Sequence, residues 1–114
     1  MKRLRNSAPF RLRMSNREGE WLISAADICY IESLNHKVFV HTKERTLAVD
    51  TPLGQLEKKI ASLPFFRCHV SYLVNLDYVE RISGYDVWVN GDRLSVSRYR
   101  RKEFLDALAA YAGD

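Results

Sequence analysis

The stretch that most constrains the fold is FFRCHVSYLVNLDYVERI, at residues 65–82. It opens with two phenylalanines, becomes polar over residues 67–69, and returns to apolar side chains before Ile82. No regular element with a single buried face has its side chains in this order. We therefore predict a buried strand that reaches the surface, a tight turn or short helical turn over residues 71–75, and a return to the core.

The polar part of this stretch carries candidate binding groups. Arg67, His69 and Ser71 have donors that suit a phosphate or a base edge. Asn75 is of the type that closes a turn through its own backbone. For His69 we favour a structural role, as a buried histidine that supports the turn at Ser71.

Hydrophobic patterning along the rest of the chain predicts a mostly β fold. Apolar and polar side chains alternate, a nearly continuous apolar run is typical of a central strand, and Asn90-Gly91 is a strong hairpin signal. These signals indicate small antiparallel sheets of about eight to ten short strands with two short helices. Outside the opening stretch, the predicted strands cover residues 10–14, 21–23, 28–31, 38–42, 47–49, 87–89 and 94–96.

The two helices have recognisable ends. Thr51-Pro52 offers a hydroxyl N-cap followed by proline at the first helical position, and one face of residues 51–60 is apolar. The second helix is predicted from about Tyr99–Ala112, with Ser97 as its cap and Gly113 as its stop.

Basic residues gather in two segments of a chain whose net charge is +4. Residues 1–17 hold Lys2, Arg3, Arg5, Arg11, Arg13 and Arg17 without an acid, and residues 98–102 hold four more cations. We interpret residues 1–9 as a flexible basic lead-in or linker remnant and residues 10–114 as one domain. A localised basic footprint favours a polyanion partner, and surface cations that only keep the protein soluble are the alternative.

Several classes of function lack their sequence signals. No apolar run approaches the roughly 20 residues of a membrane span, and the basic N-terminus lacks the apolar segment of a secretory signal, so we expect a cytoplasmic protein with no membrane partner. Cys29 and Cys68 form no C-x-x-C, and we expect no disulfide, no metal and no cofactor. No catalytic carboxylate pair, nucleophile motif or phosphate-cradling loop is recognisable, so we expect no enzyme.

Four blocks of the sequence together resemble the LytTR family of bacterial DNA-binding domains. They are IESLNHKV at 31–38, TPLGQLEKKI at 51–60, FFRCHVSYLVN at 65–75 and LSVSRYRRKEF at 94–104. The blocks occur in the expected order and span nearly the whole chain. The resemblance implies a LytTR-like β fold and a transcriptional regulator whose loops enter successive major grooves of duplex DNA.

The resemblance implies base contacts at three positions. His36 matches the histidine of E-S-x-x-H-K that enters a major groove, with a solvated loop as the alternative. Arg98, expected to open the last helix, matches an arginine that reaches a second groove, where a bidentate bond to guanine is the expected contact. Val70 departs from the family, which usually has a polar or basic residue there. Either that base is read loosely or through an apolar contact such as a thymine methyl, or the register of contact differs.

A larger set is expected to hold phosphates or to support the base contacts. The start of the last helix combines cationic side chains with backbone N–H groups, and both favour phosphate. Without a bound anion, cations at this end oppose the helix dipole and lower the stability of the helix. The set comprises Asn35, Lys37, Arg67, His69, Ser71, Tyr99, Arg100, Arg101 and Lys102.

The resemblance also implies the setting in which the chain works. Such domains bind direct repeats in double-stranded promoter DNA, often as two copies. They usually follow a receiver or sensor domain, so we expect the output domain of a two-component response regulator or a stand-alone regulator. Two alternatives come from other classes: a protein-interaction module that docks an acidic partner, and a thiol-based redox sensor that uses Cys68.

Overall fold

The apolar run at residues 28–31 lies at the centre of the largest sheet. The computed structural model describes residues 10–113, and the run begins β3 (Ile28–Leu34). Five antiparallel strands take the order β5-β4-β3-β7-β6, so β3 has a neighbour on each side. The other four strands are β4 (Lys37–Thr42), β5 (Thr46–Val49), β6 (Phe65–His69) and β7 (Tyr72–Asn75).

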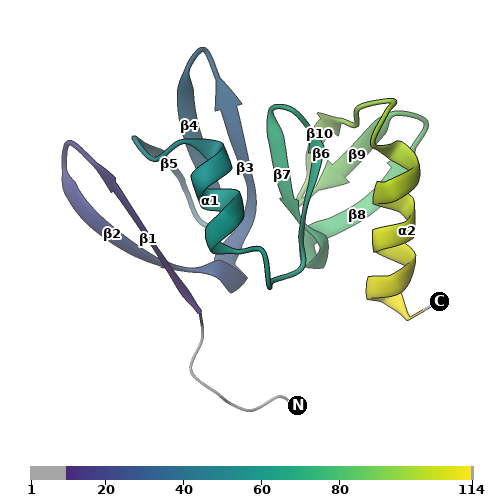
Figure 1. Ribbon diagram of the computed structural model, residues 1–114, viewed down its shortest axis with the longest axis horizontal. Helices are drawn as coiled ribbons and strands as arrows, with labels where there is room; N and C mark the ends of the chain where they lie inside the picture. The colour runs from purple at the N-terminus through teal and green to yellow at the C-terminus, as the bar shows by residue number, and fades with distance from the viewer. Residues whose placement is uncertain (1–9, 114) are drawn as a thin grey trace.

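Two hydrophobic clusters lie on the two faces of this sheet. Because successive residues of a strand point to opposite faces, Leu73 joins one cluster and Val74 the other. A hairpin and a helix contribute to the first cluster, while a three-stranded sheet and a second helix contribute to the other (Figure 1). Burial on both faces explains why the start of β3 is almost continuously apolar.

The elements on either side of the central sheet are short. On the first side lie β1 (Arg11–Asn16), β2 (Gly19–Ser24) and α1 (Leu53–Lys59). On the second side lie β8 (Val79–Ser83), β9 (Asp86–Val89), β10 (Asp92–Ser95) and α2 (Arg101–Ala112). Single 3-10 turns, η1 (Ala25–Asp27) and η2 (Leu76–Tyr78), lead into β3 and β8.

The predicted fold class is confirmed. The described residues form ten strands in three antiparallel sheets, with two α-helices. Asn90-Gly91 makes the predicted turn, with φ angles of 49° and 89°, and Gly113 ends α2 in the left-handed region. Within the described residues no helix is long and apolar enough to cross a membrane. The lead-in predicted for residues 1–9 lies outside the described residues.

The turn predicted over residues 71–75 is wrong. Residues 72–75 form β7, which pairs with β3 on one side and β6 on the other, and the turn holds only Val70 and Ser71. Ser71 and Asn75, which are both typical of turns, concealed the strand between them. Asn75 does close the next turn as predicted, since its Oδ1 accepts from Asp77 N at 2.9 Å.

Both predicted helix starts are also wrong in detail. Pro52, not Thr51, occupies the N-cap position of α1, and no side chain caps that helix. The second helix begins at Arg101, later than predicted. Ser97 Oγ accepts from Tyr99 N at 3.2 Å, which closes a separate turn ahead of the helix instead of capping it.

Candidate nucleic-acid interface

Three segments that carry the predicted base contacts lie at one edge of the molecule. They are the β3–β4 turn, the β6–β7 turn and the connection from β10 to α2. All three lie along the upper edge in Figure 1. The first two are neighbours because the C-terminal end of β3 pairs with the N-terminal end of β7, with Glu32 opposite Tyr72.

Backbone hydrogen bonds join these three segments. Ser33 N donates to Ser71 O at 2.9 Å, which ties β3, near its tip, to the β6–β7 turn. Ser97 N donates to Cys68 O at 2.8 Å, which ties the β10–α2 connection to β6. The edge is therefore one hydrogen-bonded unit instead of three independent loops.

The first segment is a two-residue turn, tighter than the polar loop the sequence indicates. Asn35 and His36 have φ angles of 51° and 65°, as a type I′ hairpin turn requires at both central positions. Asparagine tolerates this left-handed conformation, whereas most other residues lose roughly 1–2 kcal/mol there. Asn35, His36 and Lys37 are all exposed, so this strained turn displays three polar side chains.

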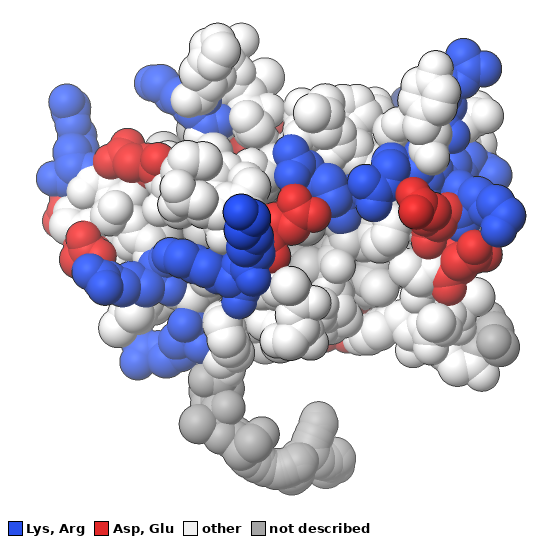
Figure 2. Space-filling model, in the orientation of Figure 1, with Lys and Arg blue, Asp and Glu red and all other residues white. Residues whose placement is uncertain are grey.

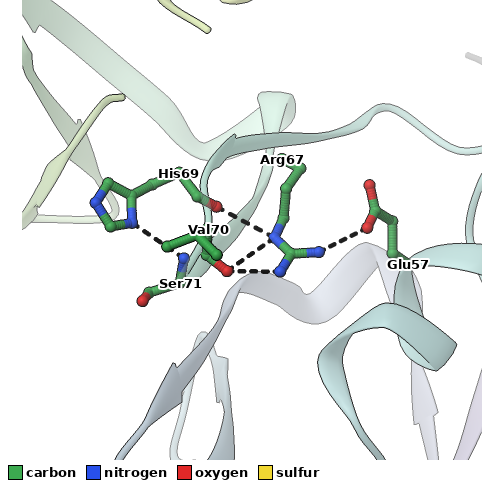
Figure 3. A network of polar contacts seen from close by, with 5 residues as sticks. All are labelled: Glu57, Arg67, His69, Val70 and Ser71. Atoms are coloured by element: carbon green, nitrogen blue, oxygen red, sulfur yellow. Dashed lines mark hydrogen bonds and ion pairs between the residues drawn. The ribbon is translucent and has the colours of Figure 1, made fainter. Parts of the chain in front are cut away.

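The second segment is the Val70-Ser71 turn, and the Arg67 guanidinium lies between this turn and Glu57 (Figure 3). Arg67 Nε donates to the carbonyl oxygens of His69 and Val70, each at 3.1 Å, and Nη1 donates to Glu57 Oε1 at 2.7 Å. His69 Nδ1 accepts from Ser71 N at 3.0 Å, which fits the structural role that we favoured, but the histidine is half-buried and not buried as predicted. Val70 remains 73% exposed at the apex.

The third segment carries Arg98 and Tyr99 ahead of α2. The expectation that Arg98 opens the helix is wrong, because Arg98 lies in the turn that Ser97 closes. Both side chains are exposed, Tyr99 by 85%. No ion pair joins Arg98 to another described residue, which leaves its guanidinium available at the edge.

The cations that follow Arg98 have partners within the chain. Arg101 Nε donates to Gly84 O at 2.6 Å, and Lys102 pairs with Asp106 at 3.2 Å. Arg100 Nε lies 3.0 Å from Glu103 Oε1, but the angle does not make a hydrogen bond. Glu103 and Asp106 reduce the electrostatic cost that the sequence indicates for cations at a helix start. This cost is therefore no sign of function here.

A family model described as the LytTr DNA-binding domain matches residues 18–109. The chain belongs to the LytTr DNA-binding domain family. The family resemblance is thereby confirmed, and the family is one of DNA-binding domains. The matched residues include all three edge segments, but which LytTr residues touch DNA stays a prediction.

Named relatives and a solved structure resemble this LytTr domain. Sensory transduction protein LytT of Bacillus cereus is 30% identical over 104 residues, which covers 86% of this chain and 42% of LytT. Transcriptional regulatory protein YpdB of Escherichia coli is 30% identical over 88 residues, which covers 68% of this chain and 35% of YpdB. A solved LytTr DNA-binding domain from Bacillus cereus has a TM-score of 0.73 at 22% identity, covering 89% of this chain and 98% of that chain. This chain therefore spans less than half the length of these two curated relatives.

The LytTr domain has a further tip at this edge that its sequence motifs did not mark. The β1–β2 turn carries Arg17, and Asn16 Nδ2 donates to Ala48 O at 2.9 Å, which holds this tip against β5. Together with His36 and Lys37, Arg17 lines an open cleft of about 1030 Å³. The sequence marks Arg17 as part of a polar turn between strands, but not the edge on which that turn lies.

Positive charge alone does not single out this edge of the LytTr domain. Figure 2 shows blue side chains along the upper edge and a second group lower, towards the end of α1, whose last turn carries Lys58 and Lys59. Exposed hydrogen-bonding groups on joined turns are what distinguish the upper edge.

The two cysteines of the LytTr domain are buried free thiols. Burial raises the pKa of Cys68 to about 12 and also raises the pKa of Cys29. A thiol that stays protonated is a weak nucleophile. No cluster of three or more potential metal-binding side chains occurs among the residues that the structure describes.

Proposed function

We propose that this domain is the DNA-reading part of a bacterial transcription regulator and that it reads duplex DNA with the joined edge. His36 and Arg98 contact bases in successive major grooves, and the Val70-Ser71 turn meets the duplex between or beside them. Asn35, Lys37 and Tyr99 support these contacts. Arg100, Arg101, Lys102 and the Ser71 hydroxyl hold phosphates.

The observation that carries this proposal is the hydrogen bonding that joins the three segments. Because Ser33–Ser71 and Ser97–Cys68 fix the segments relative to one another, the edge meets DNA preorganised and loses little conformational entropy on binding. The molecule extends 39 Å along each of its two longer axes, which is enough to cover the ~34 Å of one helical turn of DNA. One domain can thus follow one face of the duplex from groove to groove.

In this proposal Arg67 and His69 have a supporting role. The Arg67 guanidinium donates hydrogen bonds to two carbonyl oxygens and to Glu57. The Nδ1 atom of His69 accepts a hydrogen bond from Ser71 N. Neither side chain needs to touch DNA for the turn to keep its shape.

The setting of the domain is also part of the proposal. The curated relatives are roughly twice as long or longer and are named as a sensory transduction protein and a transcriptional regulatory protein. We place this chain as the output domain of a two-component response regulator, or of a stand-alone regulator. It binds direct repeats in promoter DNA, with two copies on one site.

The experiment selects bound sequences from a random duplex pool and compares three variants on the selected site. Arg98→Ala is expected to lose roughly 1–3 kcal/mol and to relax one base position, because a bidentate base contact is removed. Lys102→Ala should weaken all sequences alike and lower the salt slope by about 1. Arg45→Ala, which removes a cation from the opposite ends of the strands, is the matched control and should change neither.

Two outcomes contradict this proposal at different levels. Equal losses on selected and random DNA for Arg98→Ala would remove its base-reading role. Recovery of no preferred sequence, with weak salt dependence, would favour the protein-interaction alternative, because phosphate contacts make log affinity fall steeply with log salt. The redox alternative is disfavoured by the buried, protonated Cys68 thiol.

A further inference from the structure

Val70 is a hydrophobic side chain held in solvent by a rigid turn. It is 73% exposed, although its carbonyl oxygen accepts from Arg67 and the next residue, Ser71, is bonded to His69. A β-branched side chain is stiff at χ1, so the fixed backbone presents the two methyl groups in few orientations. The turn and its supports are drawn in Figure 3.

Other tips of the same edge also expose large hydrophobic groups. Leu34 is 52% exposed beside the His36 turn, and Tyr99 is 85% exposed beside Arg98. Tyr85 is 55% exposed on the β8–β9 turn, which a bond from Val96 N to Tyr85 O joins to the start of the α2 connection. Single exposed hydrophobic residues are normal on proteins, but four of the seven large ones that are exposed among the described residues lie on this edge.

The chemistry of the major groove identifies what Val70 can recognise. Valine has neither donor nor acceptor in its side chain, so it cannot bond to a guanine or adenine edge. The apolar group that base pairs present in the major groove is the C5-methyl of thymine. Building on the proposed function, we infer that Val70 is a specificity-determining residue that selects thymine by van der Waals contact with this methyl group.

The test uses the selected site, with each thymine replaced in turn by deoxyuridine, which lacks only the C5-methyl. At one thymine per bound domain, wild-type binding should weaken about fourfold, the factor expected for one methyl group leaving an apolar contact. Val70→Ser should bind both duplexes alike. When cytosine replaces this thymine, changing the cytosine to 5-methylcytosine should raise the affinity of the wild type about fourfold. The same change should leave the affinity of Val70→Ser unaltered.

A second variant gives a gain of function in place of a loss. Val70→Asn carries an amide that can bond to adenine N6 and N7, so repeated selection with this variant should replace thymine by adenine at that position. Because Val70 is exposed and outside the core, both variants should melt like the wild type, and melting curves check this.

The outcomes separate this inference from the proposed function. If the domain binds a preferred sequence but no thymine shows a methyl effect that depends on Val70, the inference is overturned and the proposed function stands. A methyl effect that persists in Val70→Ser assigns thymine reading to another residue and also overturns it. If no preferred sequence is recovered, both fail.

Discussion

His36 occupies a backbone conformation that suits glycine better than histidine. Its φ of 65° in a type I′ turn is a strain that the fold carries at the tip of the edge. His36→Gly should therefore raise the free energy of unfolding by about 0.5–1 kcal/mol, since strain is relieved and part of the gain is lost to unfolded-state entropy. The same variant should lose affinity for the selected DNA. Urea unfolding and a duplex titration measure the two effects.

A matched turn at the opposite edge provides the control. Asn90 has a φ of 49° in the β9–β10 turn, and Asn90→Gly should change stability slightly and DNA affinity not at all. If His36→Gly were less stable than the wild type, or bound DNA equally well, the interpretation of this strained turn as functional would be wrong.

At single residues, the sequence patterns predicted which groups make contacts better than they predicted where the backbone places those groups. The contact of His69 with the turn was predictable, because a histidine two residues before a serine in a tight turn can accept the serine's backbone N–H. The position of Arg98 was not, since the choice between helix and turn depends on Ser97 bonding to Cys68 of another strand. The sequence left Arg67 open between a phosphate contact and a supporting role, because its contact with Glu57 depends on where α1 packs.

Between elements, the contact of Arg67 with Glu57 connects α1 to the β6–β7 turn. Arg67→Lys keeps the charge but cannot reach two carbonyl oxygens and a carboxylate together. It should lower the free energy of unfolding by about 1.5–3 kcal/mol, the usual range for hydrogen bonds to a charged group. It should also weaken DNA binding through the misplaced turn, which a duplex titration beside the urea curve would detect.

An exposed pair serves as the comparison for Arg67. In the Arg13–Glu20 pair the side chains are 71% and 57% exposed, and such pairs contribute little in water. Arg13→Lys should therefore leave the urea midpoint almost unchanged. Equal midpoints for Arg67→Lys and Arg13→Lys would show that the Arg67 contacts do not hold the turn.

Elements with local signals were predictable, and those made by distant pairing were not. Asn90-Gly91 specifies its hairpin because only two residues with positive φ fit a type I′ turn. By contrast, β7 lies between β3 and β6 in the sheet, and the polar residues around it looked like a longer turn. The bulge between Arg67 and His69 in the pairing of β6 with its neighbour β7 was not predicted either.

For the whole molecule, buried titratable groups make stability depend on alkaline pH. The thiols have an ordinary pKa of 9.0, and burial raises the pKa of Cys68 to about 12 and raises those of Cys29, Tyr72 and Tyr78. Above pH 9 the unfolded chain loses protons that the folded chain keeps, so the free energy of unfolding should fall as pH rises from 9 to 12. Urea unfolding across this range measures it.

The variant Cys68→Ala separates this effect from general alkaline damage. It should be less stable than the wild type at pH 7, because a packed side chain is shortened, and its stability should decline less steeply above pH 9. Constant wild-type stability from pH 8 to pH 11 would contradict the linkage of burial to proton binding.

The arrangement of the edge belongs to the whole molecule and was beyond local prediction. His36, Val70 and Arg98 lie in three blocks far apart in the sequence, and patterning within each block says nothing about which end of a sheet it occupies. Pairing of β3 with β7 and the Ser97–Cys68 bond bring the blocks together. The family resemblance supplied the candidate residues, and the topology explains why they share one edge.

The central claim, that DNA is read by this one edge, is tested most directly by backbone amide NMR during titration with the selected duplex. If this edge reads DNA, signals from residues 33–37, 69–72 and 97–102 should shift together. Signals from the opposite edge, at residues 43–46 and 90–92, should stay in place. Shifts confined to the opposite edge, or to only one of the three segments, would contradict the account.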